Sequence, residues 1–317
     1  MNLYQIFLVN MLLEDLQVVL KVAEFRSITA AAENLDMRTA TASAALKRVE
    51  QSLGVELFIR TTRQLRISSA GEQYIPKCQK ALFELDQAKQ NIKNELNVID
   101  GEIRIAMSSD LGRNLVTPWL DKMIEQHPNI RLRSHISDSN VDFYRDAVDV
   151  ALRYGSPNDS NQYGFKICNV PRLLCASQAY LAEHGTPEQP NDLLSHNALL
   201  YQIYDILHDV WEFSKEDSKH KVRVTGNRAS NDGDLVKRWC VAGKGIAMKS
   251  SLDISAELLS EKVIPVMPEY KPISTELWLI FPSRQSITPA ARQLRDTLKE
   301  KCHYILSQLI EKEILLP

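Results

Sequence analysis

The sequence predicts an α/β protein in three parts: a small N-terminal domain of helices, a long connecting helix, and a C-terminal α/β domain of two lobes. Three patterns predict this organisation. Amphipathic helical segments fill residues 12–54, apolar residues then recur at heptad spacing, and strand-like segments alternate with helical ones beyond Gly101. At 317 residues the chain is also longer than one compact core usually holds.

The composition is that of an ordinary soluble globular protein, with 44% hydrophobic and 25% charged residues. The formal net charge is −2, so any basic patch must be local. No stretch approaches the roughly 18 apolar residues of a membrane helix, and the N-terminus lacks the features of a signal peptide. Five scattered cysteines without CxxC spacing suit a reducing compartment. We therefore expect a cytoplasmic protein that does not associate with membranes.

Two helices are expected before residue 36. In "LEDLQVVLKVAEF" one face carries Leu16, Val19, Leu20 and Ala23. Ser27 is a good N-cap for "ITAAAENL", where apolar residues follow at helical spacing. The segment "DMR" then predicts a turn.

The third helix, "TATASAALKRVEQSL", has few residues that can fill a core. Its apolar face consists of Ala42, Leu46, Val49 and Leu53. The opposite face combines small, hydroxyl and basic side chains, namely Ala40, Thr41, Ser43, Ala44, Lys47, Arg48 and Gln51. A helix of this kind fits the major groove of B-DNA, which is about 12 Å wide. A small helical bundle with a solvated polar face explains the same periodicity, and the pattern alone leaves both interpretations open.

The charge and the next segment favour the nucleic-acid interpretation. Residues 38–66 contain six basic and two acidic side chains in a chain that is net negative. Gly54 can end the helix. "ELFIR" and "QLRIS" alternate like two strands around "TTR", which predicts a hairpin with Arg60, Arg63 and Arg66 near its tip. Arginine and threonine side chains are common phosphate ligands.

Residues 13–71 resemble the winged helix-turn-helix of the LysR-type transcriptional regulators. "VAE", "AAENL", "LKRVEQSLGVELF", "RTTR" and the final "AG" carry the resemblance in order and with the correct spacing. Arg26 departs from it, because the family usually has glycine there, and "DMRTA" is an unusual turn. These departures put base preference or turn geometry in doubt, but hardly the fold.

The resemblance implies DNA-binding roles for individual residues. It assigns the recognition helix to Arg38, Thr39, Thr41, Ser43, Lys47 and Arg48, the wing to Arg60, Thr62 and Arg63, and a phosphate contact to Ser27. For Glu50 we expect a local role instead, as a salt link or a cap.

A long helix follows the winged domain. Ile75, Cys78, Leu82, Leu85, Lys89, Ile92, Leu96 and Ile99 are spaced alternately by three and four residues, which is a heptad seam interrupted at Lys89. Such a stripe predicts pairing with a second copy of the chain, and a helix lying on its own domain is the alternative. The family uses a linker helix here for dimerisation, which implies two recognition helices that read half-sites about one DNA turn, or a multiple of it, apart.

Beyond Gly101 the chain resembles the effector domain of the same family, which has a periplasmic-binding-protein-like fold. "VDVALRYG", "LCASQAYLAEHGTPEQPNDLLSHNALLY" and "VAGKGIAMKS" carry this resemblance. The expected domains are an extension (1–11), a winged helix-turn-helix (12–70), a linker helix (71–100) and an effector domain (101–310). Within the last, lobe I takes about 101–170 and 275–310, and lobe II about 171–274, with crossings near 168–172 and 270–276.

A ligand cleft is expected where parallel strands end, because helix N-termini there can hold an anion. Polar residues at these positions are the candidates for binding a small anionic effector: Ser108, Ser109, Ser137, Asp138, Arg153, Ser177, Asp232 and Lys249. Each serine could equally be a simple N-cap, an alternative that the sequence leaves open.

No catalytic, metal or cofactor motif is present: GxGxxG, GxSxG, P-loop and HExxH patterns are all missing. We therefore expect no enzyme, no metal and no cofactor. The sequence predicts a transcriptional regulator that binds double-stranded promoter DNA as a homodimer or homotetramer, responds to a small effector and works with RNA polymerase. The alternative is a metabolite-binding protein of the periplasmic-binding fold without a role in gene regulation. An enzyme on the same two-lobed scaffold is the third hypothesis.

Overall fold

The computed structural model describes residues 12–60, 65–94, 101–139, 141–143, 146, 148–157, 162–203, 206–216 and 218–315. The chain forms two compact units that divide after Lys89. The expected extension, Thr62, Arg63 and the seam residues Leu96 and Ile99 lie outside the described residues. No helix in the described ranges is long and apolar enough to cross a membrane.

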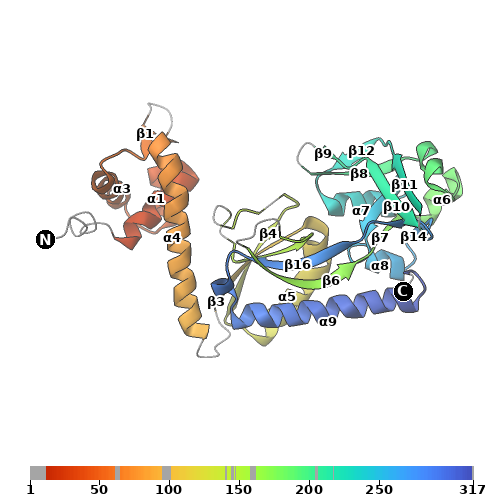
Figure 1. Ribbon diagram of the computed structural model, residues 1–317. Coiled ribbons are helices and arrows are strands. Elements are labelled where there is room, and N and C mark those ends of the chain that lie inside the picture. The colour runs from red at the N-terminus through yellow and green to blue at the C-terminus, as the bar shows by residue number, and fades with distance from the viewer. Residues whose placement is uncertain are drawn as a thin grey trace. The chain divides into compact units, whose positions relative to one another are not determined.

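The first unit contains three short helices, a hairpin and a long helix (Figure 1). These are α1 (Leu13–Phe25), α2 (Ile28–Asn34), α3 (Thr39–Leu53), β1 (Phe58–Arg60), β2 (Leu65–Ile67) and α4 (Ser69–Asn94). Ser27 caps α2 as expected, because its Oγ accepts a hydrogen bond from the backbone N–H of Ala30 at 3.2 Å. Gly54 ends α3 with a φ of +69°, which confirms its predicted role.

The core of this unit confirms the predicted faces of α2 and α3. Ala31, Ala32, Ala42, Leu46 and Val49 are buried together. The predicted face of α1 is confirmed, because Val19 is buried in this core and Leu16, Leu20 and Ala23 pack against it. The buried face also includes Val18 and Val22 and is therefore wider than the predicted one.

The predicted hairpin is confirmed. β1 and β2 pair antiparallel, with Phe58 opposite Ile67 and Arg60 opposite Leu65. Glu50 has the local role expected for it, since its Oε1 accepts hydrogen bonds from the backbone N–H groups of Leu57 at 2.8 Å and Phe58 at 3.3 Å. The carboxylate therefore ties the end of α3 to the start of β1.

The N-terminal part of helix α4 packs against the rest of the first unit. Ile75 belongs to the core of the first unit and Cys78 is buried. Leu82 is half-buried, whereas Leu85 is 54% exposed. The start of the heptad seam therefore packs inside the domain, whereas Leu85 presents its side chain to solvent.

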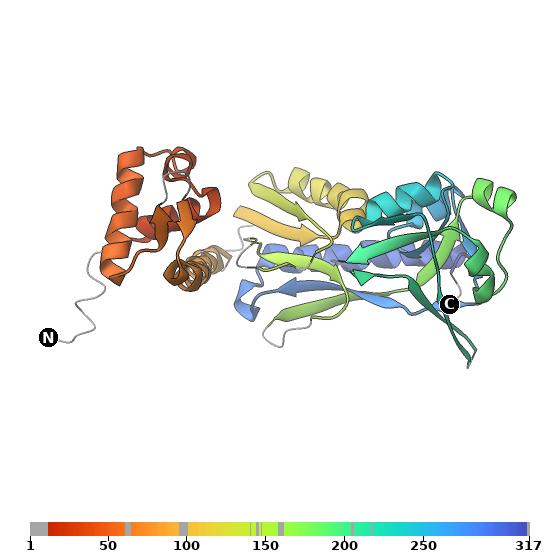
Figure 2. The same ribbon diagram turned by 90° about the horizontal axis from the view of Figure 1, so that it is seen from above.

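The second unit contains two main sheets, which define lobe I and lobe II (Figures 1 and 2). The lobe I sheet has the order β4 (Ile130–Ile136), β3 (Gly101–Met107), β5 (Val150–Tyr154), β16 (Thr275–Phe281), β6 (Tyr163–Val170). The lobe II sheet has the order β12 (Arg228–Ser230), β8 (Ala198–Ile203), β13 (Ile246–Ser250), β7 (Arg172–Ala176), β14 (Ile264–Val266), with β9 (Ile206–Leu207) paired to β8.

Each sheet has parallel strand pairs toward one edge and antiparallel pairs toward the other. β3 runs parallel to β4 and β5, and β8 runs parallel to β12 and β13, whereas β16, β7 and β14 run antiparallel to their neighbours. A separate three-stranded sheet consists of β11 (Ser218–Arg223), β10 (Val210–Lys215) and β15 (Lys271–Pro272). Two of the antiparallel strands, β7 and β16, directly follow the crossings between the lobes.

Helices cover these sheets. They are η2 (Leu111–Val116, a π-helical segment), α5 (Thr117–Gln126), α6 (Gln178–His184), η3 (Pro190–Ser195), α7 (Gly233–Val241), α8 (Ser255–Leu259), η4 (Arg284–Ser286) and α9 (Pro289–Glu311). The predicted fold class is confirmed.

The chain crosses between the lobes where expected. Pro171 separates β6 from β7, and Ile273 and Ser274 separate β15 from β16. Helix α9 adds a connection that the sequence did not predict: Leu294 and Leu298 pack in the lobe I core, while Leu309 packs in a lobe II core. The helix runs along both lobes (Figures 1 and 2).

Candidate functional site

The exposed face of α3 is the candidate DNA-binding surface. Arg38, Thr39, Thr41 and Lys47 are exposed and Ser43 is half-buried, as the helical pattern predicts. Within the described residues, the side chains of Arg38 and Lys47 have no hydrogen-bond or ion-pair partner. These two cations are therefore available to a polyanion.

The side chain of Arg48 is 43% exposed and forms an ion pair within the domain. Its Nη2 lies 2.5 Å from Oδ1 of Asp15 and its Nε lies 3.0 Å from Oδ2 of the same carboxylate. Asp15 is 2% exposed, and the hydrogen bonds from Arg48 lower its pKa although burial opposes this. Arg48 thus joins α3 to α1, a role that sequence reasoning did not find, and its assignment to the recognition surface stays a prediction.

Four other DNA contacts were predicted. Ser27 is half-buried and its hydroxyl already caps α2. Arg60 ends β1, and Thr62 and Arg63 lie outside the described residues.

Two adjoining cavities of about 240 Å³ and 460 Å³ lie at the junction of the two lobes. They share six lining residues: Ser108, Asp138, Tyr154, Arg172, Tyr201 and Ile203. Ser108 follows β3, Asp138 follows β4 and Tyr154 ends β5, so the carboxyl ends of the parallel strands of lobe I meet here. Arg172 begins β7 and Tyr201 lies in β8, both in lobe II. The predicted cleft therefore corresponds to a real cavity.

The smaller cavity is mainly apolar above a charged floor. Leu199, Trp211, Val236 and Met248 contribute apolar lining. The floor includes Asp110, Lys249, Ser250 and Asp253.

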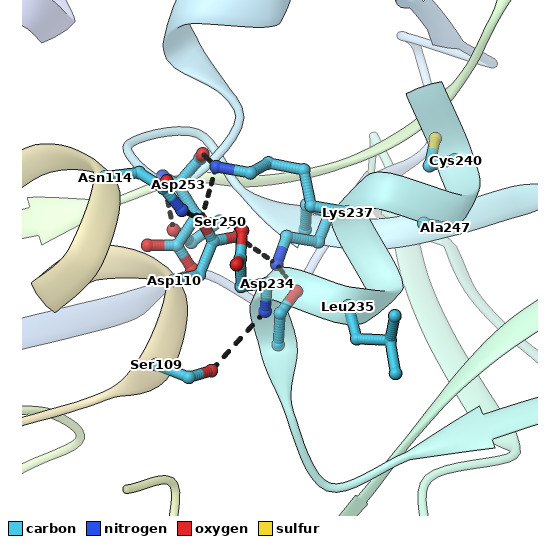
Figure 3. A network of polar contacts seen from close by, with 12 residues as sticks. Ser109, Asp110, Asn114, Asp234, Leu235, Lys237, Cys240, Ala247, Ser250 and Asp253 are labelled. Carbon is cyan, nitrogen blue, oxygen red and sulfur yellow. Dashed lines mark hydrogen bonds and ion pairs between the residues drawn. The ribbon is translucent and has the colours of Figure 1, made fainter. Parts of the chain in front are cut away.

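The floor is a buried ion-pair network between the lobes (Figure 3). Asp110 of lobe I accepts from two lysines of lobe II: its Oδ1 lies 2.5 Å from Nζ of Lys237 and its Oδ2 lies 2.6 Å from Nζ of Lys249. The side chains of all three residues are at most 6% exposed. Lys249 also donates to the carbonyl of Gly233 at 2.8 Å. Burial opposes the charge of Lys249, but the Asp110 carboxylate outweighs it and raises the pKa of this lysine.

Asp138 makes a second bridge between the lobes. Its Oδ1 accepts from the backbone N–H of Ser109 and its Oδ2 accepts from the Ser109 hydroxyl, both at 2.6 Å. The same Oδ2 accepts from the backbone N–H of Gly233 at 2.8 Å, at the N-terminus of α7. The chain's own carboxylate therefore occupies the position where an anion binds a helix N-terminus.

Two further pairs extend this contact. Arg113 Nη1 lies 2.8 Å from Oδ2 of Asp232, and the amide nitrogen of Asn114 lies 2.8 Å from Oδ1 of Asp234. All four residues stand on the two helical segments that face each other across the junction, η2 and the start of α7.

Tyr154 and Asp253 form the last polar group at the floor. The Tyr154 hydroxyl donates to Oδ1 of Asp253 at 2.6 Å and lies 2.8 Å from the hydroxyl of Ser250. Burial and the nearby negative charge of Asp110 raise the pKa of Asp253 to about 6. This carboxyl is therefore poised to change its charge near neutral pH.

The predicted effector residues fall into two groups. Ser108, Asp138, Arg153 and Lys249 line a cavity. The others do not: Ser109 and Asp232 hold the lobes together, the Ser137 hydroxyl accepts from the Ser139 N–H at 3.1 Å, and Ser177 caps α6. For Ser177 the simple N-cap alternative describes the geometry.

Sequence reasoning missed Arg172 and Tyr201 as lining residues. Arg172 lies at the end of the predicted lobe crossing, and a crossing strand must run between the lobes, so this position could have been found. Within the described part of the chain, no cluster of three or more His, Cys, Asp or Glu side chains could hold a metal.

Comparison with known proteins identifies relatives of both units. The family model described as a bacterial regulatory helix-turn-helix protein of the lysR family matches residues 13–72, and the model described as a LysR substrate binding domain matches residues 97–303. The HTH-type transcriptional regulator DmlR of Escherichia coli K12 is 32% identical over 289 residues, which cover 91% of this chain and 94% of that protein. The HTH-type transcriptional activator TtdR of the same strain is 27% identical, with 85% and 87% covered.

Solved structures of full-length proteins match as well. CrgA, a LysR-type transcriptional regulator from Neisseria meningitidis, is 26% identical with a TM-score of 0.56, and the match covers 93% of this chain and 98% of that one. The Vibrio cholerae virulence activator AphB matches with a TM-score of 0.60 over 91% of this chain and 98% of that one, and its 24% identity indicates a shared fold alone.

Proposed function

The chain belongs to the LysR family of bacterial transcriptional regulators, and from this premise we propose that it binds promoter DNA as a homodimer or homotetramer under the control of a small anionic effector. The observation that carries the DNA-binding part is the exposed face of α3, which presents small, hydroxyl and unpaired basic side chains. The opposite face of the helix packs four apolar residues into the core of the first unit. We place this activity in the cytoplasm, where promoter DNA is, with RNA polymerase as the further partner. We assign the protein no catalytic activity.

The proposed DNA contacts follow the exposed face and the wing. They are Ser27, Arg38, Thr39, Thr41, Ser43 and Lys47 from the helices, and Arg60, Thr62 and Arg63 from the wing. Arg48 has a positioning role in this proposal, because its guanidinium is engaged with the buried Asp15. Small residues at the centre of α3 allow the helix to approach base edges closely, and the bases around them can neutralise phosphates.

The proposed division of labour keeps residues 12–70 for DNA, 71–100 for dimerisation and 101–310 for the effector. Leu85, which is 54% exposed on α4, supports pairing of this helix with a second copy. The effector part is supported by the two adjoining cavities between the lobes. A small molecule bound there can shift the population of lobe arrangements and, through α4, the spacing of two DNA-binding domains.

The test is a footprint of the purified protein on the DNA upstream of its own gene and of neighbouring genes, at low and at physiological salt. We expect protection of paired half-sites that weakens as salt rises, because phosphate contacts release counterions. Lys47→Ala weakens this protection, whereas Lys122→Ala on α5 leaves it unchanged. Absence of any protected site at either salt concentration contradicts the proposal and favours a metabolite-binding protein without a regulatory role.

A further inference from the structure

Building on the proposed function, we infer that the effector is a monoanion with a compact apolar body, whose anionic group binds Arg172 and Ser108 at the junction of the two cavities.

The helix N-termini of the cleft are not available to a ligand. Asp138 accepts hydrogen bonds from Ser109 and from the N–H of Gly233, so it fills the anion position shared by the two helical segments. Asp232 caps α7 by accepting from the N–H groups of Asp234 at 2.9 Å and Leu235 at 3.1 Å. A second anion placed here would meet two carboxylates and no free donor.

The cations of the floor are engaged as well. Lys249 and Lys237 both bind Asp110, and each is at most 6% exposed. Removing either lysine from this carboxylate to bind a ligand would leave a buried charge without its partner, which is strongly unfavourable. The smaller cavity therefore offers an anionic ligand no free positive charge at its floor.

Two donors remain at the shared wall of the cavities. The hydroxyl of Ser108 is buried and has no hydrogen-bond partner among the described residues. The side chain of Arg172 is exposed and, within the same residues, makes no hydrogen bond or ion pair. Both residues line both cavities, so one anionic group can meet a hydroxyl and a guanidinium together.

The rest of the smaller cavity suits an apolar group. Leu199, Trp211, Val236 and Met248 line it, and its volume of about 240 Å³ limits the body to a compact one. The other guanidinium, Arg153, lines only the larger cavity. A ligand whose anionic group meets Arg172 and whose apolar body enters the smaller cavity therefore has one guanidinium within that cavity.

Arg172 is also placed to report binding. It begins β7 directly after the crossing at Pro171, and it pairs with Ser250 on β13. Thr275, which begins β16 after the other crossing, lines the same small cavity. A ligand held by Arg172 thus touches both strands that connect the lobes, where a small displacement changes the angle between them.

The experiment measures binding of three acids and their neutral amides to the full-length protein by calorimetry and thermal shift. The acids are benzoate, cyclohexanecarboxylate and hexanoate, and succinate serves as a dianion without an apolar body. We expect at least one of the three acids to bind and raise Tm, and its amide and succinate to bind at least tenfold more weakly. Arg172→Gln raises Kd for that acid by about tenfold to a hundredfold, the range of one charged hydrogen bond. Ser108→Ala raises it less.

The matched control is Arg292→Gln, which changes an exposed arginine on α9 and leaves Kd unchanged. No binding of any acid to the wild-type protein, equal binding of acids and amides, tighter binding of succinate, or an unchanged Kd in Arg172→Gln overturns the inference. The promoter footprint is recorded on the same samples. If protection persists while the acids fail, only the ligand class is wrong, and loss of the footprint itself contradicts the proposed function.

Discussion

The Nζ of Lys249 lies 2.6 Å from Oδ2 of Asp110, so a cation of lobe II and a carboxylate of lobe I form an ion pair that solvent hardly reaches. Lys237 binds the other oxygen of the same carboxylate. The two lobes therefore share one charged network at the floor of the cleft, in addition to the two crossings and helix α9. A lobe movement that separated these groups would leave buried charges unpaired, so an effector of ordinary affinity is expected to adjust the angle between the lobes rather than to open them widely.

Asp110→Asn tests this network. We expect the free energy of unfolding of the second unit to fall by about 3–5 kcal/mol, because two buried lysines lose their counterion. Denaturant unfolding followed by tryptophan fluorescence measures it selectively, since Trp119, Trp211, Trp239 and Trp278 all lie in this unit.

The control for this prediction is Asp296→Asn, which removes the exposed partner of Arg295 on α9. Exposed pairs contribute about 0–1 kcal/mol, so its effect on unfolding is expected to be small. If Asp110→Asn costs no more than this surface change, the network does not hold the lobes together.

Local patterns predicted the elements of this fold well, and long-range pairing explains what they missed. Ser27, Gly54 and the hairpin strands carry short-range signals, and each has its expected place. Ser109, Asp232 and Lys249 looked like ligand donors because polar residues at strand ends and helix N-termini suit anions. Each binds another residue of the chain instead: Ser109 binds Asp138, Asp232 binds Arg113, and Lys249 binds Asp110. Partners such as Asp110 and Lys249, 139 residues apart, cannot be inferred from spacing. Asp15 is a similar case, since its burial makes sense only beside Arg48.

The raised pKa of Asp253 predicts a pH dependence. A pKa of about 6 in the folded state, against 3.8 for the free side chain, means that the folded protein binds this proton more tightly. The stability from this group is therefore complete below about pH 4 and is lost as the pH rises through about 6. The whole difference of about two pKa units corresponds to about 3 kcal/mol.

Asp253→Asn replaces the titrating carboxyl group by a neutral amide, whose oxygen can still accept a hydrogen bond from the Tyr154 hydroxyl. We expect the variant to gain stability relative to the wild-type protein between pH 4.5 and pH 7.5, by about 2 kcal/mol across the interval. Unfolding of both proteins at the two pH values gives the difference directly and cancels the other carboxyl groups. A difference that does not vary with pH contradicts the prediction.

Arg26 occupies a backbone conformation that suits glycine. It ends α1 with φ +50° and ψ +30°, in the left-handed region, at the position where the family usually has glycine. Because a side chain in this region is strained, Arg26→Gly is expected to stabilise the first unit by about 1 kcal/mol. Hydrogen exchange of the α1 amides measures the gain. Gln17→Gly, an exposed change inside the same helix, should lose about as much, and equal effects of the two substitutions would refute the argument from strain.

Lys47 and Arg48 are neighbours on α3 with different predicted roles, and paired variants separate them. The Lys47 side chain has no partner within the described residues, so Lys47→Ala should weaken promoter binding, reduce the salt dependence by about one phosphate contact and leave stability unchanged.

Arg48→Ala removes the partner of Asp15, which is 2% exposed, and should lower the free energy of unfolding of the first unit by about 1–3 kcal/mol. The salt dependence of promoter binding distinguishes the two variants, because its slope reports the number of phosphate contacts. Loss of a positioning residue leaves that number nearly constant, provided that the binding is measured at a temperature where the domain stays folded. If Arg48→Ala lowers that slope as much as Lys47→Ala does and leaves stability intact, Arg48 contacts DNA directly and its pairing with Asp15 gives way when DNA binds.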